Sequence, residues 1–215
     1  MNEDKGSLPG RSILIIGAGG HAKVVADILL CSGLVVMGFV DDNPAIWGEQ
    51  RLGLPVLGAI DTYASYEAGG LVMGIGDNEN RMQVVERLGQ PAGKLWRQAI
   101  HPRAILAASV VVGRGVVVVA GAVVNPDTVL GDHVIVNTGA TIDHDCEIGD
   151  YAHIAPGVHI SGGVHVGTAA LIGVGASVAP GRSIGVRAIV GAGAAVVHDL
   201  PDGVTAKGVP ARYQR

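Results

Sequence analysis

The chain has 215 residues, of which 48% are hydrophobic, and its formal net charge is −4. This supports one or two domains with buried cores, while the lack of a basic run argues against nucleic acid as a partner. No apolar stretch approaches the roughly 20 residues of a membrane span, and the polar N-terminus does not look like a signal peptide. We therefore expect a soluble, cytoplasmic protein, in which Cys31 and Cys146 stay reduced.

The first eleven residues are polar and are expected to form a flexible arm. From residue 12 an aliphatic strand, a glycine turn and an amphipathic helix follow, which predicts a β–α unit. The turn places Gly17, Gly19 and Ala22 in the spacing G-x-G-x-x-[GA], where small residues let the backbone approach a phosphate at a helix N-terminus. The same glycines would suit a tight turn without a ligand, so both interpretations stay open.

A second strand is predicted over residues 35–40, and it ends at Asp41 and Asp42. A dinucleotide-binding fold has its ribose-binding acid at about this place, whereas the alternative is a turn with a solvated acidic pair. Residues 54–58 predict a short strand, residues 71–81 a strand and a loop, and the segment from Met82 a helix that ends at Gly89. Residues 12–100 thus predict a small Rossmann-like α/β domain.

An aliphatic residue occupies every sixth position from Leu106 to Val196. Short β segments joined by tight corners have this period, whereas helices and simple alternating strands do not. Pairs of an aliphatic residue and glycine recur every 18 residues, so three hexads make one turn of a solenoid in which residue n lies beside residue n + 18. The segment after residue 198 leaves this rhythm and is expected to cap the last coil. Residues 101–215 therefore predict a parallel β-helix.

Three histidines of the repeat, His153, His159 and His165, occupy one slot on three successive faces of a coil. Only histidines of several chains could then share a metal ion, so we expect no metal site. His144 differs because it is predicted at a corner, next to Asp145. A carboxylate orients an imidazole and favours the cation formed on proton uptake, which suits a general base. An exposed histidine without a catalytic role is the alternative.

Several motifs resemble the sialic acid O-acetyltransferase family of hexapeptide-repeat acyltransferases: the turn Gly-Ala-Gly-Gly-His, Val-Asp-Asp, Ile-Gly-Asp-Asn, Ile-His-Pro, NTGATIDH and Gly-Val-Pro-Ala. The resemblance covers nearly the whole chain and implies that the β-helix is left-handed. It points to the branch of N-acetyltransferases that act on nucleotide-linked 4-amino-sugars. It also implies acetyl-CoA as co-substrate and a homotrimer that binds CoA between adjacent solenoids.

The resemblance assigns roles to single residues. His144 matches the general base and Asp145 the acid that raises its basicity. Gly162 matches a backbone amide that faces the thioester oxygen. The full set that matches acetyl-CoA contacts is His153, Gly162, Val174 and Ala192. The positions that match nucleotide-sugar contacts are Gly19, Gly20, His21, Asp41, Asp42 and Gly76.

These features predict transfer of an acetyl group from acetyl-CoA to the 4-amino group of a UDP- or GDP-linked deoxy-sugar, for bacterial surface-glycan synthesis. The α/β domain would hold the nucleotide and extend the sugar toward His144, which would take a proton from the attacking amine. O-acetylation of a sialic acid-type sugar is the alternative, since the sequence does not separate amine from hydroxyl acceptors. A nucleotide-sugar sensor without catalysis and an NAD-dependent oxidoreductase are further hypotheses.

Overall fold

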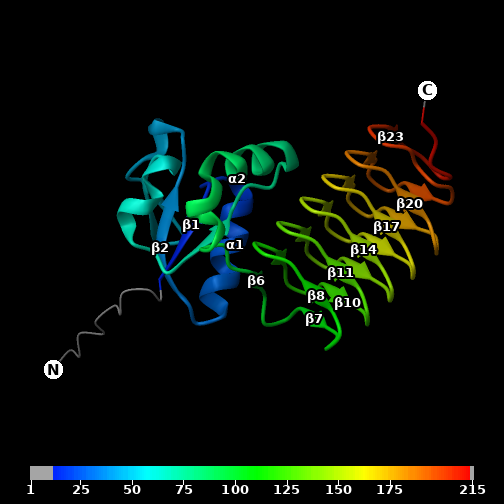
Figure 1. Cartoon of the computed structure of the whole chain (residues 1–215), viewed down its shortest axis with the longest axis horizontal. Helices are drawn as coiled ribbons and strands as arrows, with labels where there is room; N and C mark the ends of the chain where they lie inside the picture. The colour runs from blue at the N-terminus through cyan, green and yellow to red at the C-terminus, as the bar shows by residue number, and fades with distance from the viewer. Residues whose placement is uncertain (1–11, 214–215) are drawn as a thin grey trace.

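A computed structural model describes residues 12–213, so the arm expected over residues 1–11 lies outside the described part. Figure 1 shows an α/β unit at the N-terminal end and a solenoid whose coils run away from it toward the C-terminus. Within residues 12–213, no helix is long and apolar enough to cross a membrane.

A five-stranded sheet forms the centre of the N-terminal unit, in the order β3-β4-β2-β1-β5. Its strands are parallel except for the pair β3 and β4. The strands are β1 (Ser12–Ile16), β2 (Val35–Val40), β3 (Gln50–Arg51), β4 (Leu54–Gly58) and β5 (Gly70–Met73), with the short 3-10 helices η1 (Pro44–Ile46) and η2 (Ile60–Tyr66) in the connections. The strands predicted from residue 12, over residues 35–40 and over residues 54–58 are confirmed.

The first helix, α1 (Gly20–Cys31), follows the glycine turn as predicted. The second, α2 (Asn78–Gly93), begins four residues before the predicted start, in a segment that was expected to be a loop. It begins there because the Asp77 carboxylate accepts a hydrogen bond from the backbone N–H of Asn80 at 2.9 Å and so caps the first turn. At Gly89 the backbone leaves the helical conformation, with a φ of +57° and a ψ of −155°, and a short second helical stretch follows to Gly93. The predicted start of this helix was therefore wrong, whereas the first helical stretch ends at Gly89 as predicted.

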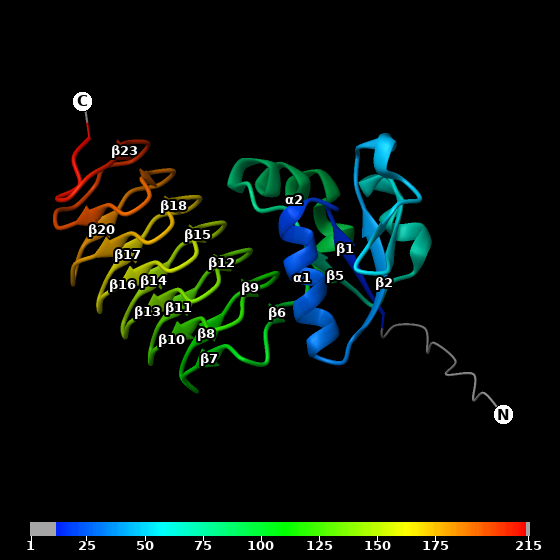
Figure 2. The ribbon, with the colours of Figure 1, turned by 180° about the vertical axis from the view of Figure 1, so that it is seen from behind.

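The two helices cover opposite faces of the sheet, because successive side chains of a strand point to opposite sides. Ile13 and Ile15 of β1 pack with α1, whereas Leu14 and Ile16 pack with α2. The core around α1 also contains buried residues of the solenoid, among them Val117, Val119 and Ile135. The N-terminal unit therefore packs on the solenoid through α1, which lies against the first coils in Figure 2.

The solenoid consists of three parallel sheets, which we call faces 1, 2 and 3 in the order in which each coil passes through them. Face 1, the one on which α1 packs, contains β6 (Ala99–Ile100), β9 (Val117–Val118), β12 (Ile135–Val136), β15 (His153–Ile154), β18 (Leu171–Ile172), β21 (Ile189–Val190) and β23 (Thr205–Ala206). Face 2 contains β7 (Ile105–Leu106), β10 (Val123–Val124), β13 (Thr141–Ile142), β16 (His159–Ile160), β19 (Ser177–Val178) and β22 (Ala195–Val196). Face 3 contains β8 (Val111–Val112), β11 (Val129–Leu130), β14 (Glu147–Ile148), β17 (His165–Val166) and β20 (Ser183–Ile184).

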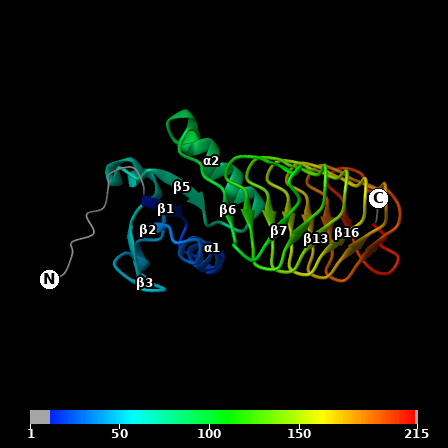
Figure 3. The same cartoon turned by 90° about the horizontal axis from the view of Figure 1, so that it is seen from below.

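Neighbouring strands of a face pair residue n with residue n + 18, as Thr141 does with His159. The predicted period of three hexads per turn is thus confirmed. Val136, Ile142 and Ile148 point into the interior and are at most 2% exposed. Such side chains form one continuous core along the solenoid. Figure 3 shows the stacked coils that surround this interior, in which each coil buries its neighbour's edge.

The chain after β22 closes the far end of the solenoid. β23 adds a last rung to face 1, and the backbone N–H of Ala211 donates to the carbonyl of Ala195 at 2.7 Å. Leu200 and Ala211 are both buried. These residues therefore cover the last coil.

Candidate active site

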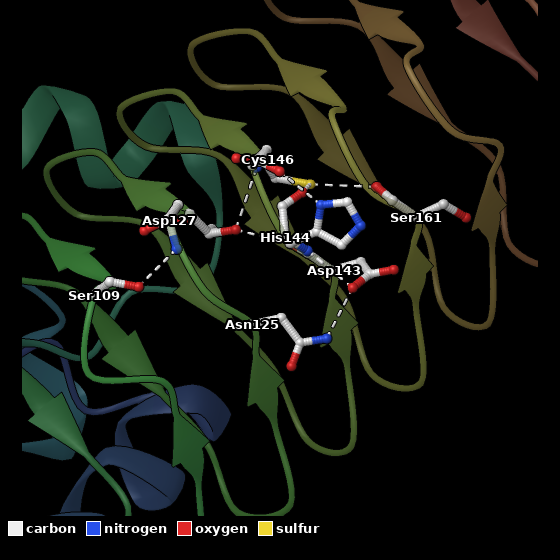
Figure 4. Close-up of polar contacts among 9 residues, drawn as sticks. Ser109, Asn125, Asp127, Asp143, His144, Cys146 and Ser161 are labelled. Carbon is white, nitrogen blue, oxygen red and sulfur yellow. Dashed lines mark hydrogen bonds and ion pairs between the residues drawn. The ribbon is translucent and has the colours of Figure 1, made fainter.

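His144 lies at the corner between faces 2 and 3, where its ring projects from the solenoid (Figure 4). Its Nδ1 lies 2.7 Å from Oδ2 of Asp145, and its side chain is 59% exposed. The hydrogen bond to Asp145, together with the charge of Asp143, raises the pKa of His144. In the neutral ring Nδ1 therefore carries the hydrogen toward Asp145, and Nε2 is left as a proton acceptor.

The next coil places Gly162 directly against this ring. A Cβ atom at Gly162 would lie only 2.7 Å from Cε1 of His144, so glycine makes room for the imidazole. Within residues 12–213, the backbone N–H of Gly162 donates to no protein acceptor. A free N–H beside a base is the arrangement that an oxyanion requires.

The residues around this corner are fixed by polar contacts, as Figure 4 shows. Asp143 accepts a hydrogen bond from Nδ2 of Asn125 at 2.9 Å and another from the backbone of His144, and these bonds lower the pKa of its carboxyl group. Burial raises the pKa of the Cys146 thiol, whose sulfur contacts the Ser161 carbonyl at 3.3 Å. Cys146 is thus a protonated core residue and not a nucleophile.

A cavity of about 620 Å³ opens at the carboxyl end of the sheet in the N-terminal unit. Gly17 is needed at its turn, because φ is +95° there and a Cβ would lie 2.8 Å from the side chain of Ile75. All six predicted nucleotide-sugar residues line this cavity: Gly19, Gly20, His21, Asp41, Asp42 and Gly76.

The two aspartates at the end of β2 accept hydrogen bonds from backbone N–H groups. Asp41 accepts a hydrogen bond from the N–H of Ala18 at 2.8 Å, and Asp42 accepts one from the N–H of Ile60 at 3.1 Å. Asp42 also contacts Arg87 at 2.7 Å. The pair is therefore more than a solvated turn: it shapes the wall of the cavity and places a guanidinium there.

His153 lies on face 1, next to the cavity. Its Nδ1 is 3.2 Å from the carbonyl of Gly76 and its Nε2 is 3.1 Å from Nδ2 of Asn137. Both contacts are satisfied by a neutral ring that donates through Nδ1 and accepts through Nε2. Burial, with the nearby charge of Arg81, lowers the pKa of His153 to about 4. His21, whose ring centroid is 6.4 Å from that of His153, has its pKa lowered to about 4, chiefly by burial.

The predicted site residues of one chain form two separate groups. His144, Asp145 and Gly162 lie at the corner between faces 2 and 3, opposite face 1. The other group is on the side of face 1: His153 lies on this face, and Val174 and Ala192 lie at its corner with face 2. The six residues of the cavity belong to the N-terminal unit, which packs on face 1. In one chain the nucleotide cavity and His144 are therefore on different sides of the solenoid.

The described part of the chain holds one cluster with metal-ligating groups, Asp27, Cys31 and His101. Nδ1 of His101 accepts a hydrogen bond from the backbone N–H of Arg103 at 2.9 Å, so the neutral ring carries its hydrogen on Nε2 and has no lone pair free for a metal. The cluster does not fit a cation. The histidines of β15, β16 and β17 lie on three different faces, as the repeat predicted.

Arg81 and Arg87 of α2 have roles at the cavity that no motif of the sequence indicates. Arg87 lines the cavity, and Arg81 is buried beneath its wall. The predicted helix from Met82 contained Arg87 but not Arg81. Recognition of the Asp77 cap in the sequence would have placed Arg81 on the same helix, beside the strand end.

Comparison with known proteins connects these observations. Residues 12–88 match the PglD N-terminal domain, and residues 127–162 match the bacterial transferase hexapeptide repeat. The crystal structure of PerB from Caulobacter crescentus, in complex with CoA and GDP-perosamine, is 44% identical, with a TM-score of 0.86 over 95% of this chain and 97% of that chain. The chain belongs to this family of hexapeptide-repeat transferases. Its solenoid is accordingly a left-handed parallel β-helix, as predicted.

Further acetyltransferases are similar to this chain. Two variants of the Caulobacter crescentus perosamine N-acetyltransferase, in which one histidine is replaced by asparagine or alanine, are 43% identical. The acetyltransferase domain of PglB from Neisseria gonorrhoeae, solved with acetyl coenzyme A, is 38% identical, with a TM-score of 0.87 over 95% of this chain and all of that chain. An uncharacterised protein of Acanthamoeba polyphaga mimivirus is 38% identical over 104 residues, and this chain covers only 20% of its length.

Proposed function

We propose that this family member is an N-acetyltransferase that moves the acetyl group of acetyl-CoA to the 4-amino group of a nucleotide-linked deoxy-sugar. The observation that carries the proposal is the exposed pair of His144 and Asp145 at a solenoid corner, with the free N–H of Gly162 beside it. The relatives solved with CoA, acetyl coenzyme A and GDP-perosamine support the choice of both substrates. We assign nucleotide binding to residues 12–100 and acetyl transfer to residues 101–215.

In the proposed reaction, the sugar amine attacks the carbonyl carbon of the thioester. Nε2 of His144 takes a proton from the amine as the new C–N bond forms, and the N–H of Gly162 stabilises the oxyanion. The C–S bond then breaks, and the proton passes from His144 to the leaving thiolate of CoA. Because the buried thiol of Cys146 stays protonated, the acetyl group moves directly and not through an acyl-enzyme.

The cavity of the N-terminal unit is the proposed nucleotide site. Gly19 and Gly20 have open space beside their Cα atoms, so a diphosphate can approach the N-terminus of α1 closely. The first turn of α1 carries no acidic side chain that would repel it. Asp41 and Asp42 lie farther along the cavity, where carboxylates can accept hydrogen bonds from a ribose or a base.

We further propose that each complete site is built from two chains of a homotrimer. His144 lies opposite face 1, so a sugar held in the cavity of its own chain cannot reach it around the solenoid. A neighbouring chain can present its corner to face 1, where His153, Val174 and Ala192 would contact CoA. The Val174 side chain is 56% exposed, as such a contact surface requires.

Mixed oligomers test this arrangement. Gly19→Asp places a carboxylate where a diphosphate would bind, and His144→Asn removes the base, so each variant alone should be nearly inactive. After random mixing in equal amounts, about one quarter of the sites would combine an intact cavity with an intact His144 of another chain. Activity near a quarter of the wild-type value supports the shared site, whereas a mixture as inactive as its parents contradicts it.

An amine acceptor is favoured over the hydroxyl of a sialic acid-type sugar, because perosamine N-acetyltransferases are among the relatives. The kinship with sialic acid O-acetyltransferases remains a sequence prediction. We place the enzyme in the cytoplasm, where its two free thiols would stay reduced, and in the synthesis of a bacterial surface glycan.

The proposed activity is tested by following CoA release from acetyl-CoA with a panel of UDP-, GDP- and dTDP-linked 4-amino-sugars and with free sialic acid. We expect turnover with one nucleotide amino-sugar, lost in His144→Asn. Turnover with sialic acid alone would assign an O-acetyltransferase instead. Binding of a nucleotide amino-sugar without any CoA release would indicate a sensor.

A further inference from the structure

Arg81 is a buried cation that forms no ion pair with any carboxylate of residues 12–213. Its side chain is 1% exposed, and it lies where the first turn of α2 meets the solenoid. Burial lowers its pKa to about 10, so it is still charged at neutral pH. A buried charge persists only where hydrogen bonds replace its lost hydration.

Each of the five N–H donors of Arg81 has one neutral oxygen acceptor. Nε donates to the carbonyl of His133 at 3.0 Å. Nη1 donates to the carbonyls of Ile75 and Gly76 at 3.2 and 2.9 Å. Nη2 donates to the carbonyl of Tyr151 at 2.7 Å and to Oδ1 of Asn78 at 2.9 Å. One side chain thus joins the loop after β5 to two successive coils.

The solenoid acceptors form a regular column. His133, Tyr151 and Ala169 follow one another at intervals of 18 residues at the corner between faces 3 and 1, and all three have a φ near +60°. In residues 12–213 no backbone N–H donates to their carbonyls. Arg81 binds the first two, and Nδ2 of Asn78 binds the third at 2.9 Å. The first turn of α2 therefore docks on three coils at once.

Two further backbone acceptors of Arg81 belong to the nucleotide cavity. Ile75 and Gly76 form part of its wall, and Gly76 also contacts His153 through its carbonyl. Because the guanidinium is a rigid planar fork, it fixes this wall relative to the coils that carry His153. The helix α2 is already held by its own backbone hydrogen bonds and does not need a buried charge for its stability. The presence of Arg81 at this place therefore requires another explanation than the stability of the core.

We propose that Arg81 is a positioning residue, which holds the Ile75–Gly76 wall of the nucleotide cavity at a fixed place on face 1. This inference rests on the proposed function, since it assumes that the cavity binds a nucleotide. Arg81 touches no substrate in this role. It sets the shape of the cavity and the direction in which a bound sugar points along face 1.

Calorimetry on the full chain tests the role with free GDP, free UDP, free dTDP and CoA as probes. Arg81→Lys keeps the charge but has three donors on one nitrogen, and Arg81→Met keeps the length but has none. We expect both variants to bind the preferred nucleotide about tenfold or more weakly, because several hydrogen bonds to the wall are lost. Their affinity for CoA should stay within about twofold of wild type.

Arg97→Met is the matched control, because Arg97 also donates to carbonyls, but only within the N-terminal unit and away from the cavity. It should leave nucleotide affinity unchanged. If Arg81→Lys binds the nucleotide as tightly as wild type, the positive charge or the packing of the side chain is sufficient for nucleotide binding. The positioning role of the guanidinium is then overturned. If the wild-type chain binds none of GDP, UDP and dTDP in the same experiment, the proposed function itself fails, and the role of Arg81 with it.

Asn78→Ala covers the case in which the Arg81 variants do not fold. It removes the donor to Ala169 and the acceptor of Nη2, while Arg81 keeps its four other bonds. Nucleotide affinity should then fall about threefold to fivefold, with unchanged CoA affinity. If Asn78→Ala binds the nucleotide as tightly as the wild-type chain, the docking of α2 on the solenoid does not set the shape of the cavity.

Discussion

His144 and His153 lie nine residues apart in one coil, yet their surroundings are opposite. His144 is 59% exposed, and the hydrogen bond to Asp145 raises its pKa. His153 is largely buried against the N-terminal unit, and its pKa is lowered to about 4. The same side chain is thus a base at one corner and a neutral hydrogen-bonding group on face 1. Position on the coil decides which chemistry a histidine can do.

The two rings also differ in how many of their nitrogen atoms have a hydrogen-bond partner in the protein. Both nitrogens of His153 have protein partners, Gly76 and Asn137, so the ring serves to hold its neighbours. His144 uses only Nδ1 and leaves Nε2 open to solvent. Substitutions of His144 and His153 should therefore have different effects on stability and on catalysis.

The largest effect should be acid unfolding driven by the buried histidines. The pKa values of His21, His133 and His153 are lowered to about 4, mainly by burial, whereas an unfolded histidine has a pKa near 6.5. The unfolded chain therefore binds more protons in this range. Their stabilisation is present above pH 6.5 and is lost as the pH falls toward 4, at about 1.4 kcal/mol per pH unit for each histidine.

Urea unfolding between pH 7 and pH 4.5 measures this slope. His133→Asn should reduce this slope by the contribution of one histidine, because asparagine does not titrate. Asparagine also tolerates the φ of +57° at this position. Below about pH 5.5, His144→Asn should leave the slope unchanged, because an imidazole with a raised pKa is largely protonated there in both the folded and the unfolded chain. A wild-type slope that no change at the buried histidines reduces would refute their neutral state.

The next effect separates the two histidines in catalysis. His144→Asn should lower kcat by roughly 10²- to 10⁴-fold, the usual contribution of a general base, with little change in nucleotide affinity. His153→Asn should instead raise KM by about tenfold, because it loses hydrogen bonds that hold Gly76 and Asn137. Steady-state kinetics with both substrates varied measures the split. Equal losses of kcat in the two variants would remove the distinction.

A smaller effect is expected from Gly162→Ala. The new Cβ would lie 2.7 Å from Cε1 and 2.8 Å from Nε2 of His144, so the ring must move. A displaced base should lower kcat by roughly tenfold to a hundredfold without destabilising the fold. Gly93→Ala is the control, since its Cβ would meet only the end of the Gln90 side chain at 3.8 Å. Wild-type kcat in Gly162→Ala would show that the ring does not act from its observed position.

The smallest effect should come from Asp145→Asn. The side chains of His144 and Asp145 are both exposed, and exposed pairs contribute little, so we expect a loss of about fivefold in kcat/KM at its optimum. The pKa of His144 would fall without the carboxylate. Because the base acts only when neutral, the acid limb of the pH–rate profile should move to lower pH. A limb that does not move would mean that Asp145 does not set the basicity of His144.

The sequence was sufficient to predict the solenoid, because the sixfold and 18-residue periods are direct consequences of the coil geometry. It also placed His144 at a corner, since each hexad slot has a fixed direction. The strands of the N-terminal unit followed from their aliphatic runs in the same way.

What the sequence could not provide is the arrangement of the two units. Nothing in a local pattern shows that α1 packs on face 1 or that the first turn of α2 docks beside it, and these contacts place the nucleotide cavity away from His144 of the same chain. Arg81 was missed for the same reason, because its partners His133 and Tyr151 are 52 and 70 residues away. The start of α2 was missed because the Asp77 cap lies in a stretch of polar residues that also suits a loop.

The most direct test of the central claim is to compare the titration of His144 with the pH dependence of catalysis. Side-chain NMR of the wild-type chain, with His144→Asn to assign the signal, gives the pKa of this imidazole. We predict a value above 6.5 that coincides with the acid limb of kcat/KM for acetyl transfer. An activity limb that follows a different group, or a His144 that titrates below 6.5, would contradict His144 as the base.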